Sequence, residues 1–223
     1  TPEQMLQIAD LAAEFGNGEV RLTIWQNFLL PNIRSEAIET VKARLEAIGL
    51  DWRQSNLRSG VVACTGNAYC KFAMADTKGH AQSIADYLDA RLILDQPINI
   101  HLTGCPHSCA QHYMGDIGLL ATSVKTGTGT EEAYHVFVGG GFGKTRALGR
   151  QIAKSLPLEK LKLHLERMLR TFQDQKQTGE TFQQFTQRHD EHALAKLFDR
   201  EGQTAAKAVA TLSAPLDRHL KAE

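Results

Sequence analysis

Helical and extended hydrophobic patterns alternate in the first sixty residues of the chain. Residues 1–15 carry apolar side chains three or four positions apart, the spacing of one helix face. Over residues 20–24, apolar and polar side chains alternate as in a half-buried strand. A second helical stripe covers residues 35–48, and Ser35 is suited to cap its N-terminus. The order helix, strand, helix predicts a small unit over residues 1–60.

The central part of the chain, residues 61–156, combines strand patterns with helical ones. Extended patterns cover residues 61–63, 98–103, 117–124 and 134–138. Helical patterns cover about 67–76, 84–88 and 145–155. The last two strands flank Gly127-Thr128-Gly129, a flexible segment that predicts a hairpin. We therefore expect a mixed sheet with flanking helices.

The last part of the chain, residues 157–223, is helical and polar. One amphipathic face, which predicts a helix packed on the body of the protein, consists of Leu158, Leu161, Leu165, Met168, Leu169 and Phe172. A second helical segment covers about 180–200, and the Ala-, Lys- and Thr-rich last twenty residues predict a frayed tail. The expected fold class is α+β, divided into portions 1–60, 61–156 and a helical extension with a tail over 157–223.

The composition is that of an ordinary globular protein and excludes several classes. Hydrophobic residues make up 42% of the 223 residues and charged residues 22%. Twenty-five Lys and Arg balance 25 Asp and Glu, so no basic surplus indicates nucleic acid or an anionic membrane surface as a partner. No apolar run approaches the roughly 18 residues of a transmembrane helix.

The start of the chain and its small number of cysteines indicate how the chain is processed and in which compartment it is found. The sequence opens with Thr1 rather than Met and has no signal-peptide pattern, so we expect a processed chain or a piece of a longer one. Four cysteines are too few for a disulfide scaffold, which small secreted domains need in place of a large core. We therefore expect a cytoplasmic protein in which the cysteines have a chemical function.

The cysteines form two pairs, Cys64-x5-Cys70 and Cys105-x3-Cys109, separated by 34 residues. A disulfide, a structural zinc site and four unrelated buried thiols are the alternatives to a shared iron–sulfur centre. Zinc sites use shorter Cys-x-x-Cys-type knuckles, which the first pair fits poorly. Each pair lies beside Gly or Pro, where exposed backbone N–H groups can hydrogen-bond a thiolate or sulfide. The spacing favours a cubane cluster, because soft sulfur ligands match iron.

The residues around the cysteines resemble one known family. The segments that carry the resemblance are Ala63-Cys64-Thr65-Gly66-Asn67-Ala68-Tyr69-Cys70 and His101-Leu102-Thr103-Gly104-Cys105-Pro106-His107-Ser108-Cys109. Further segments that match in the expected order are Arg21-Leu22-Thr23 with Gln26-Asn27, Asp116-Ile117-Gly118 and Val136-Phe137-Val138-Gly139-Gly140. Together they are similar to the nitrite and sulfite reductases, the sirohaem and 4Fe–4S enzymes. The similarity spans residues 1 to about 205.

The resemblance implies cofactors, ligands and a reaction. Cys64, Cys70, Cys105 and Cys109 would hold a 4Fe–4S cluster, and the Cys109 thiolate would also bridge to the sirohaem iron. The implied reaction is the six-electron reduction of nitrite to ammonia, as in nitrate assimilation, with electrons from ferredoxin or a flavoprotein. The implied fold is the nitrite/sulfite reductase haemoprotein fold, with a ferredoxin-like half-domain over 1–60 and the sirohaem and 4Fe–4S binding part over 61–156.

The cysteine motifs are more similar to those of ferredoxin–nitrite reductases than to those of NADPH-dependent sulfite reductases. In the latter, Pro typically precedes the second cysteine, where this chain has Tyr69. Some sulfite reductases nevertheless carry the nitrite-type motif, so the reduction of sulfite to sulfide is the alternative reaction. The related cobalamin-pathway monooxygenases are a third, weaker alternative.

The resemblance also implies a missing partner. Family members are longer and consist of two homologous halves, and this chain resembles the C-terminal half. The basic residues that bind the substrate anion, and many that bind sirohaem, come from the other half in the family. We therefore expect an oxidoreductase that is incomplete as the isolated chain. A non-catalytic cofactor-binding or electron-transfer half, which needs the N-terminal half as its partner, is the non-enzymatic alternative.

Several polar residues admit both a functional and a structural interpretation. His101, His107 and His112 lie near the second cysteine pair and could donate protons, although a histidine is more often a hydrogen-bonded surface or core residue. Gln26 and Asn27 follow a strand, and they either contact a cofactor or simply end the strand. The sequence assigns no catalytic residue.

The glycine-rich segment before residue 145 does not form a phosphate-binding loop. Gly143-Lys144-Thr145 has the end of the Walker pattern, but Val138 stands where the pattern requires glycine. The segment is expected to be a strand-to-helix turn, with close backbone approach to the cofactor as the alternative.

Overall fold

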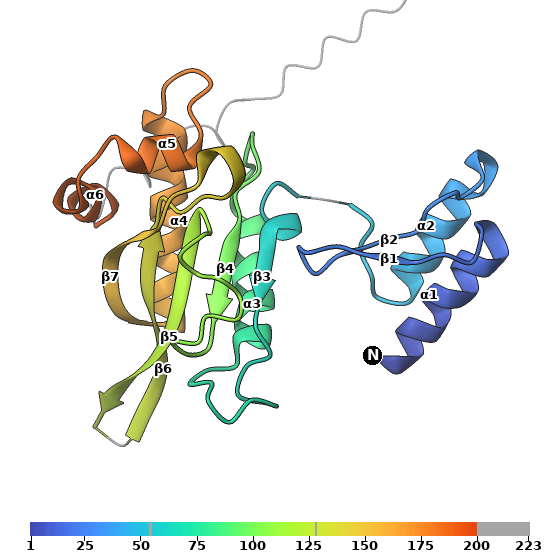
Figure 1. Cartoon of the computed structure of the whole chain (residues 1–223), viewed down its shortest axis with the longest axis horizontal. Helices are drawn as coiled ribbons and strands as arrows, with labels where there is room; N and C mark the ends of the chain where they lie inside the picture. Colours follow the sequence, from blue (N-terminus) through green and yellow to red (C-terminus); the bar gives the residue numbers. More distant parts are fainter. Residues whose placement is uncertain (54, 128, 200–223) are drawn as a thin grey trace, which may run out of the picture.

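The computed structural model describes residues 1–53, 55–127 and 129–199. Figure 1 shows a small unit, built from the start of the chain, beside a larger body that contains the main sheet. The frayed tail expected at the end of the sequence lies outside the described residues. Within the described ranges, no helix has the length and apolar character needed to cross a membrane.

The small unit packs two helices against a two-stranded antiparallel hairpin. Its elements are α1 (Pro2–Phe15), β1 (Arg21–Leu22), β2 (Phe28–Leu29), the 3-10 helix η1 (Ser35–Ala37) and α2 (Ile38–Ala47). Leu11, Val41 and Leu45 are buried between these elements. The two predicted helices are confirmed, but Ser35 is not the N-cap of α2. It begins η1 instead, and the N-cap of α2 is Ala37.

The body is organised around a five-stranded mixed sheet with the order β3-β4-β5-β6-β7. The strands are β3 (Val61–Ala63), β4 (Ile100–Thr103), β5 (Ile117–Thr126), β6 (Gly129–Val138) and β7 (Arg150–Pro157). β3, β4 and β5 are parallel, whereas β6 is antiparallel to both β5 and β7. Because β3 and β4 are adjacent and parallel, the segments that leave their C-terminal ends start at the same edge of the sheet.

The body also contains helical segments, of which α3 (Thr77–Asp89), α4 (Leu158–Gln175) and α6 (Glu191–Phe198) contact the sheet. The others are η2 (Arg58–Gly60), η3 (Gly143–Thr145) and α5 (Phe182–Gln187). α3 and α4 also contact each other. The predicted apolar face of α4 is confirmed, because Leu161, Leu165, Met168, Leu169 and Phe172 are fully buried. The expected α+β fold with a mixed sheet is likewise confirmed.

Two predicted helices are wrong. Residues 145–155 lie largely in β7, which pairs with β6 with two register shifts. Ser155 has a φ of 53°, and its N–H donates to His135 Nδ1 at 3.2 Å, so the strand is irregular there. This irregularity breaks the alternation of apolar side chains by which a strand is recognised. Residues 67–76 form turns, because the Asn67 N–H closes the segment onto the Ala75 carbonyl at 3.0 Å.

The buried His164 on α4 is expected to make folding stability depend on pH. Burial lowers the pKa of His164 from 6.5 to about 4, with nearby Asp199 opposing the shift and Arg167 adding to it. Between these values the unfolded chain binds the proton and the folded chain does not, so the free energy of unfolding rises as the pH rises from 4 to 6.5. At about 1.4 kcal/mol per pKa unit, the full effect is roughly 3 kcal/mol.

Thermal unfolding followed across this pH range measures that effect. The variant His164→Leu removes one titrating group and should reduce the rise by roughly 3 kcal/mol, while the buried His112, whose pKa is also lowered to about 4, continues to contribute to it. The matched control is His192→Leu, which changes an exposed histidine of α6. An unchanged pH dependence in His164→Leu would show that other groups control the stability.

Candidate metal centre

The fold brings the two cysteine pairs to the same edge of the sheet. Cys64 directly follows β3, and Cys105 is the second residue after β4. The two strands are in register with Ala63 opposite Leu102, and the Cys64 N–H donates to the Leu102 carbonyl at 3.0 Å. Cys64 and Cys105, the first residues of the two pairs, therefore follow the ends of neighbouring strands.

The loops that carry the remaining cysteines also contact each other. The Met74 N–H donates to the Gly104 carbonyl at 2.8 Å. The rings of Phe72 and His107 meet edge to face with centroids 5.1 Å apart. A Cβ on Gly104 would lie 2.6 Å from the Cβ of Ala73, so only glycine permits this approach of the two loops.

The sulfur of Cys64 already has hydrogen-bond partners. The Gly104 N–H donates to Cys64 Sγ at 3.1 Å, and Thr77 Oγ1 lies 3.4 Å from the same sulfur. Such contacts stabilise a thiolate and tune the potential of a bound iron–sulfur cluster. This chemistry of soft sulfur donors with backbone N–H partners fits a 4Fe–4S cluster.

All four cysteines are free thiols with different exposure. Cys105 is buried, Cys64 and Cys70 are partly exposed, and Cys109 is exposed. In the described parts of the chain, no three His, Cys, Asp or Glu side chains converge closely enough to hold a single metal ion. The structure thus brings the loops together without closing the four sulfurs around one ion.

The segment around the second cysteine pair has an unusual backbone. Ser108 and Gln111 have φ values of 55° and 56°, a region that residues other than glycine rarely adopt. The loop returns to the sheet at His112, whose Nδ1 lies 2.8 Å from Ser108 Oγ and whose ring packs against Phe137. Such strain persists only where surrounding contacts fix the backbone, and it is concentrated at functional sites.

The three histidines near this segment have different environments. Burial lowers the pKa of His101, and its Nδ1 lies 2.7 Å from the Ala110 carbonyl while its Nε2 is buried without a hydrogen-bond partner. Burial also lowers the pKa of His112 to about 4, so both rings are neutral near pH 7. These contacts favour the structural interpretation for His101 and His112. His107 is exposed and lies against Phe72.

Gln26 and Asn27 join the small unit to the body. The Gln26 amide donates from Nε2 to the Ala63 carbonyl at 2.8 Å and accepts at Oε1 from the Ala63 N–H at 3.2 Å, so it extends the edge of β3. Asn27 Nδ2 donates to the Ser59 carbonyl at 3.0 Å. Lys78 Nζ donates to Gln26 Oε1 at 2.7 Å. Burial lowers the pKa of Lys78, and negative charge on the nearby Cys64 sulfur opposes that shift.

The glycine-rich segment connects two strands rather than a strand and a helix, so the predicted strand-to-helix turn is wrong. Gly143–Thr145 forms η3 between β6 and β7. A Cβ on Gly140 would lie 2.4 Å from the Gly115 carbonyl oxygen, which shows close backbone approach to the end of the second cysteine segment.

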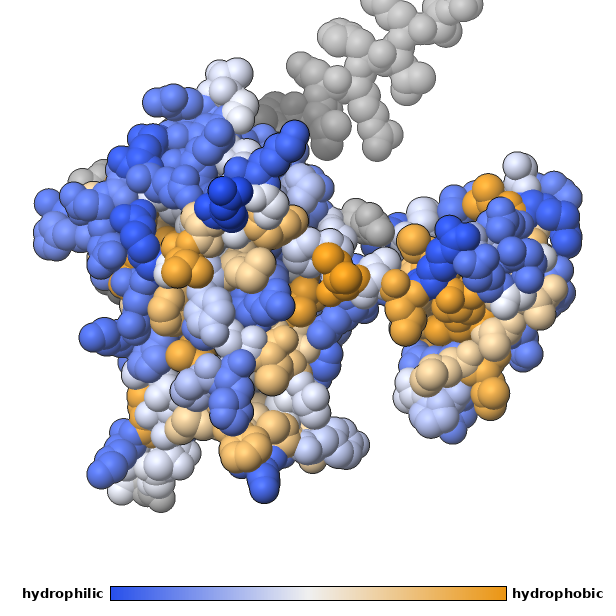
Figure 2. All heavy atoms as spheres, viewed as in Figure 1, coloured by the Kyte–Doolittle hydropathy of each residue, from blue (hydrophilic) through white to orange (hydrophobic). Residues whose placement is uncertain are grey.

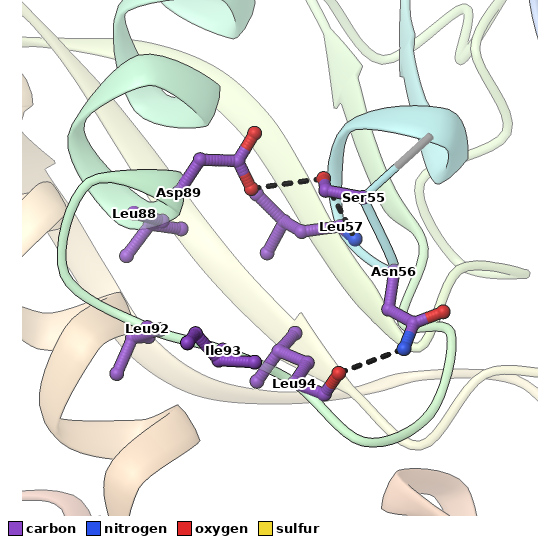
Figure 3. A pocket seen from close by; sticks show the side chains of 8 residues that line it. All are labelled: Ser55, Asn56, Leu57, Leu88, Asp89, Leu92, Ile93 and Leu94. Atoms are coloured by element: carbon purple, nitrogen blue, oxygen red, sulfur yellow. Dashed lines mark hydrogen bonds between the residues drawn. The ribbon is translucent and has the colours of Figure 1, made fainter. Parts of the chain in front are cut away.

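The pocket in Figure 3 is separate from the cysteines. It has a volume of about 380 Å³ and lies at the C-terminal end of α3, whereas the first cysteine pair leads into the N-terminal end of that helix. Its polar side chains bond to the protein: Ser55 Oγ donates to Asp89 Oδ1 at 2.9 Å, and Asn56 Nδ2 donates to the Leu94 carbonyl at 2.7 Å. The pocket therefore contributes nothing to the cysteine site.

The fold and the paired cysteine loops define a metallocofactor-binding α+β protein, and comparison with known proteins shows its family. Residues 54–203 match the family described as "Nitrite and sulphite reductase 4Fe-4S domain". Residues 1–48 match the "Nitrite/Sulfite reductase ferredoxin-like half domain". The chain belongs to the nitrite and sulphite reductase family, as its motifs predict. Membership implies a 4Fe–4S cluster and sirohaem as cofactors.

Relatives of both substrate classes are similar to this chain. Sulfite reductase (ferredoxin) 2 of Mycolicibacterium paratuberculosis is 36% identical over 85% of this chain and 36% of the relative. Chloroplastic ferredoxin–nitrite reductase of Zea mays is 39% identical over 70% of this chain and 28% of the relative. The solved structure of the Mycobacterium tuberculosis NirA protein matches with a TM-score of 0.78 and 30% identity, over 86% of this chain and 36% of that one. The chain thus spans about a third of the length of these relatives.

Proposed function

We propose that this chain is part of an enzyme that reduces nitrite to ammonia by six electrons, with ferredoxin as the electron donor. The observation that carries the proposal is the meeting of two cysteine loops at the C-terminal ends of adjacent parallel strands. The nitrite-type cysteine motifs and the 39% and 37% identity to ferredoxin–nitrite reductases of Zea mays and Synechococcus elongatus support this substrate.

Under this proposal, Cys64, Cys70, Cys105 and Cys109 hold the 4Fe–4S cluster. Cys109 supplies the thiolate that also bridges to the sirohaem iron, and its exposure supports that role. A bound cluster and sirohaem supply the storage and transfer of electrons to the substrate. The protein's own contribution is position: the Gly104 N–H stabilises the Cys64 thiolate, and the Lys78 ammonium adds positive charge beside it.

A second half is part of this proposal. Exposed apolar side chains gather on the small unit, including Leu22 at 86% and Ile24 at 85% exposure (Figure 2). An apolar surface of this kind is typical of a contact with another protein surface. We assign the anion-binding cations to that other half, in the same or a separate chain. We propose in addition that the chain divides into portions 1–60, 61–156 and 157–223.

Two alternatives share the same centre. The alternative of sulfite reduction is supported by the 36% and 33% identity to two ferredoxin sulfite reductases of Mycolicibacterium paratuberculosis, over 85% and 84% of this chain. A cofactor-binding half without activity of its own is the other alternative.

The test is an anaerobic absorption spectrum followed by reductase assays. The chain is purified with the second half, and its spectrum, iron and acid-labile sulfide are measured. We expect sirohaem bands and about five irons per complex, four from the cluster and one from the haem. Reduced ferredoxin should then support ammonia formation from nitrite at a higher kcat/KM than sulfide formation from sulfite. The opposite preference supports the sulfite alternative, and cofactor uptake without turnover supports the non-catalytic one.

A further inference from the structure

The loop between β3 and α3, residues 64–76, carries Cys64 and Cys70 and is here called the Cys70 loop. Its two ends lie together, since the Asn67 N–H donates to the Ala75 carbonyl at 3.0 Å. Its middle is exposed, with Tyr69 at 91% exposure. The segment around Cys70 is therefore held by its contacts with the second cysteine loop at Phe72 and Met74 and by contacts at the two ends of the Cys70 loop.

One side chain from a distant strand bonds to both ends of this loop. Glu132 lies on β6, and its Oε1 accepts from Asn67 Nδ2 at 2.7 Å. Its Oε2 accepts from the Asp76 backbone N–H at 2.9 Å. Both donors lie in the Cys70 loop, more than 50 residues before Glu132 in the sequence, so these bonds tie the loop to the central sheet.

The carboxylate is itself held in place. Glu132 Oε2 lies 3.6 Å from His80 Nε2, and His80 Nδ1 lies 2.9 Å from the hydroxyl of the fully buried Tyr134. Tyr134 is two residues from Glu132 on β6, so both side chains point to the same face of the strand. His80 thus links Glu132 to Tyr134, a second residue of the same strand.

The contacts of Glu132 are not those of an ordinary helix cap. The N-cap of α3 is Asp76, whose own side chain accepts from the Gly79 N–H at 3.0 Å. Glu132 binds the N–H of Asp76 itself, which precedes the helix. It therefore orders the loop rather than the first turn of α3.

We propose that Glu132 is a positioning residue of the cysteine site. Its carboxylate accepts hydrogen bonds from both ends of the Cys70 loop and so orders the segment that carries Cys70 before the cluster binds. This inference rests on the proposed function for the identity of the cluster. Glu132 does not touch the cysteine sulfurs and acts through the loop. Pre-ordering of a ligand loop slows the loss of the bound group, because each excursion of the loop must first break these bonds.

The bonds can be broken singly and then restored. Glu132→Gln keeps the shape of the side chain but removes its negative charge, so neutral amide contacts take the place of the two charge-assisted hydrogen bonds. Asn67→Asp places two carboxylates against each other where a 2.7 Å hydrogen bond existed. In the double variant, the new glutamine amide can donate to the new carboxylate at position 67 while its oxygen accepts from the Asp76 N–H. The matched control is Glu131→Gln, an exposed neighbour that points to the other face of β6.

The first measurement is the rate at which an iron chelator removes the cluster from the reconstituted full chain. Hydrogen bonds to charged groups contribute enough that we expect each single variant to lose the cluster about tenfold faster. The double variant should return to within about twofold of the parent, and Glu131→Gln should not differ from it. A merely destabilising change would not be rescued by a second substitution. Equal rates for Glu132→Gln and Glu131→Gln would overturn the inference.

The second measurement needs no cofactor. Hydrogen exchange of the Asp76 amide in the cluster-free chain should become about tenfold faster in Glu132→Gln and should recover in the double variant. If the parent chain takes up no cluster under any condition, the proposed function fails, and this exchange alone decides whether Glu132 holds the loop. An unchanged exchange rate of the Asp76 amide in Glu132→Gln would refute the role of Glu132 in ordering the loop.

Discussion

Replacing Cys105 with serine is expected to reduce bound iron and acid-labile sulfide from about four of each per chain to nearly none. Cys105 is the only buried thiol of the four, and it lies where the two cysteine loops meet. A serine hydroxyl is a hard ligand that ionises with difficulty, so it does not replace a thiolate on iron. The same loss is expected for serine at Cys64, Cys70 and Cys109.

The measurement is a count of iron and sulfide on anaerobically reconstituted chain, with the absorption spectrum of the same sample. Thermal unfolding of the cluster-free variants is the control: Cys→Ser changes the side-chain volume little, so each variant should still unfold cooperatively, with the largest decrease in unfolding midpoint at the buried Cys105. A Cys105→Ser chain that retains four irons would contradict the ligand assignment. Zinc in place of iron in the parent chain would support the structural zinc site instead.

The cysteine arrangement could be predicted because its determinants are local. The alternation over 98–103 indicates a strand that ends two residues before Cys105, and the apolar run 61–63 ends directly before Cys64. Two strands that lead directly into cysteines place those cysteines at strand ends, whatever the rest of the fold. The glycines beside them are also explained locally. Gly66 has a φ of 76°, and a Cβ at Gly104 would collide with Ala73.

Other features could not be predicted, because they depend on pairing between distant segments. The side chain of Gln26 extends the edge of β3 through Ala63, which is 37 residues away. Glu132 is 65 residues from Asn67, and nothing in its neighbourhood distinguishes it from the exposed Glu131. The helix predicted over 145–155 is wrong because the irregular pairing of β7 with β6 hides the strand period. In each case the partner, and not the local sequence, decides the role of the residue.

The fold, and not the sequence motif, explains why position 118 is a glycine. The Asp116-Ile117-Gly118 segment matches the family pattern, but the sequence does not explain why glycine is required. In the structure Gly118 lies on β5 between His101 of β4 and Phe137 of β6. The segment that follows Cys109 crosses it so closely that a Cβ would lie 1.8 Å from the His112 carbonyl oxygen.

Gly118→Ala is therefore expected to be strongly destabilising. The new methyl group cannot be accommodated without displacing the backbone at His112, because the neighbouring strands on both sides fix β5. Overpacking of this kind costs roughly 3 kcal/mol. For a chain of this size that corresponds to a decrease in the unfolding midpoint of about 6–12 °C. The displaced backbone is three residues from Cys109, so we also expect less cluster to be retained.

Calorimetry and iron analysis of Gly118→Ala test both effects against a second glycine of the same hairpin. Gly129→Ala is the control, since Gly129 begins β6 and a Cβ there meets nothing within 4 Å. Its unfolding midpoint should stay within about 2 °C of the parent, the range of neutral surface substitutions. If the two variants unfold alike, the backbone at His112 yields easily and does not fix Cys109. If Gly118→Ala alone loses both stability and iron, the close contact between β5 and the backbone at His112 fixes the position of Cys109.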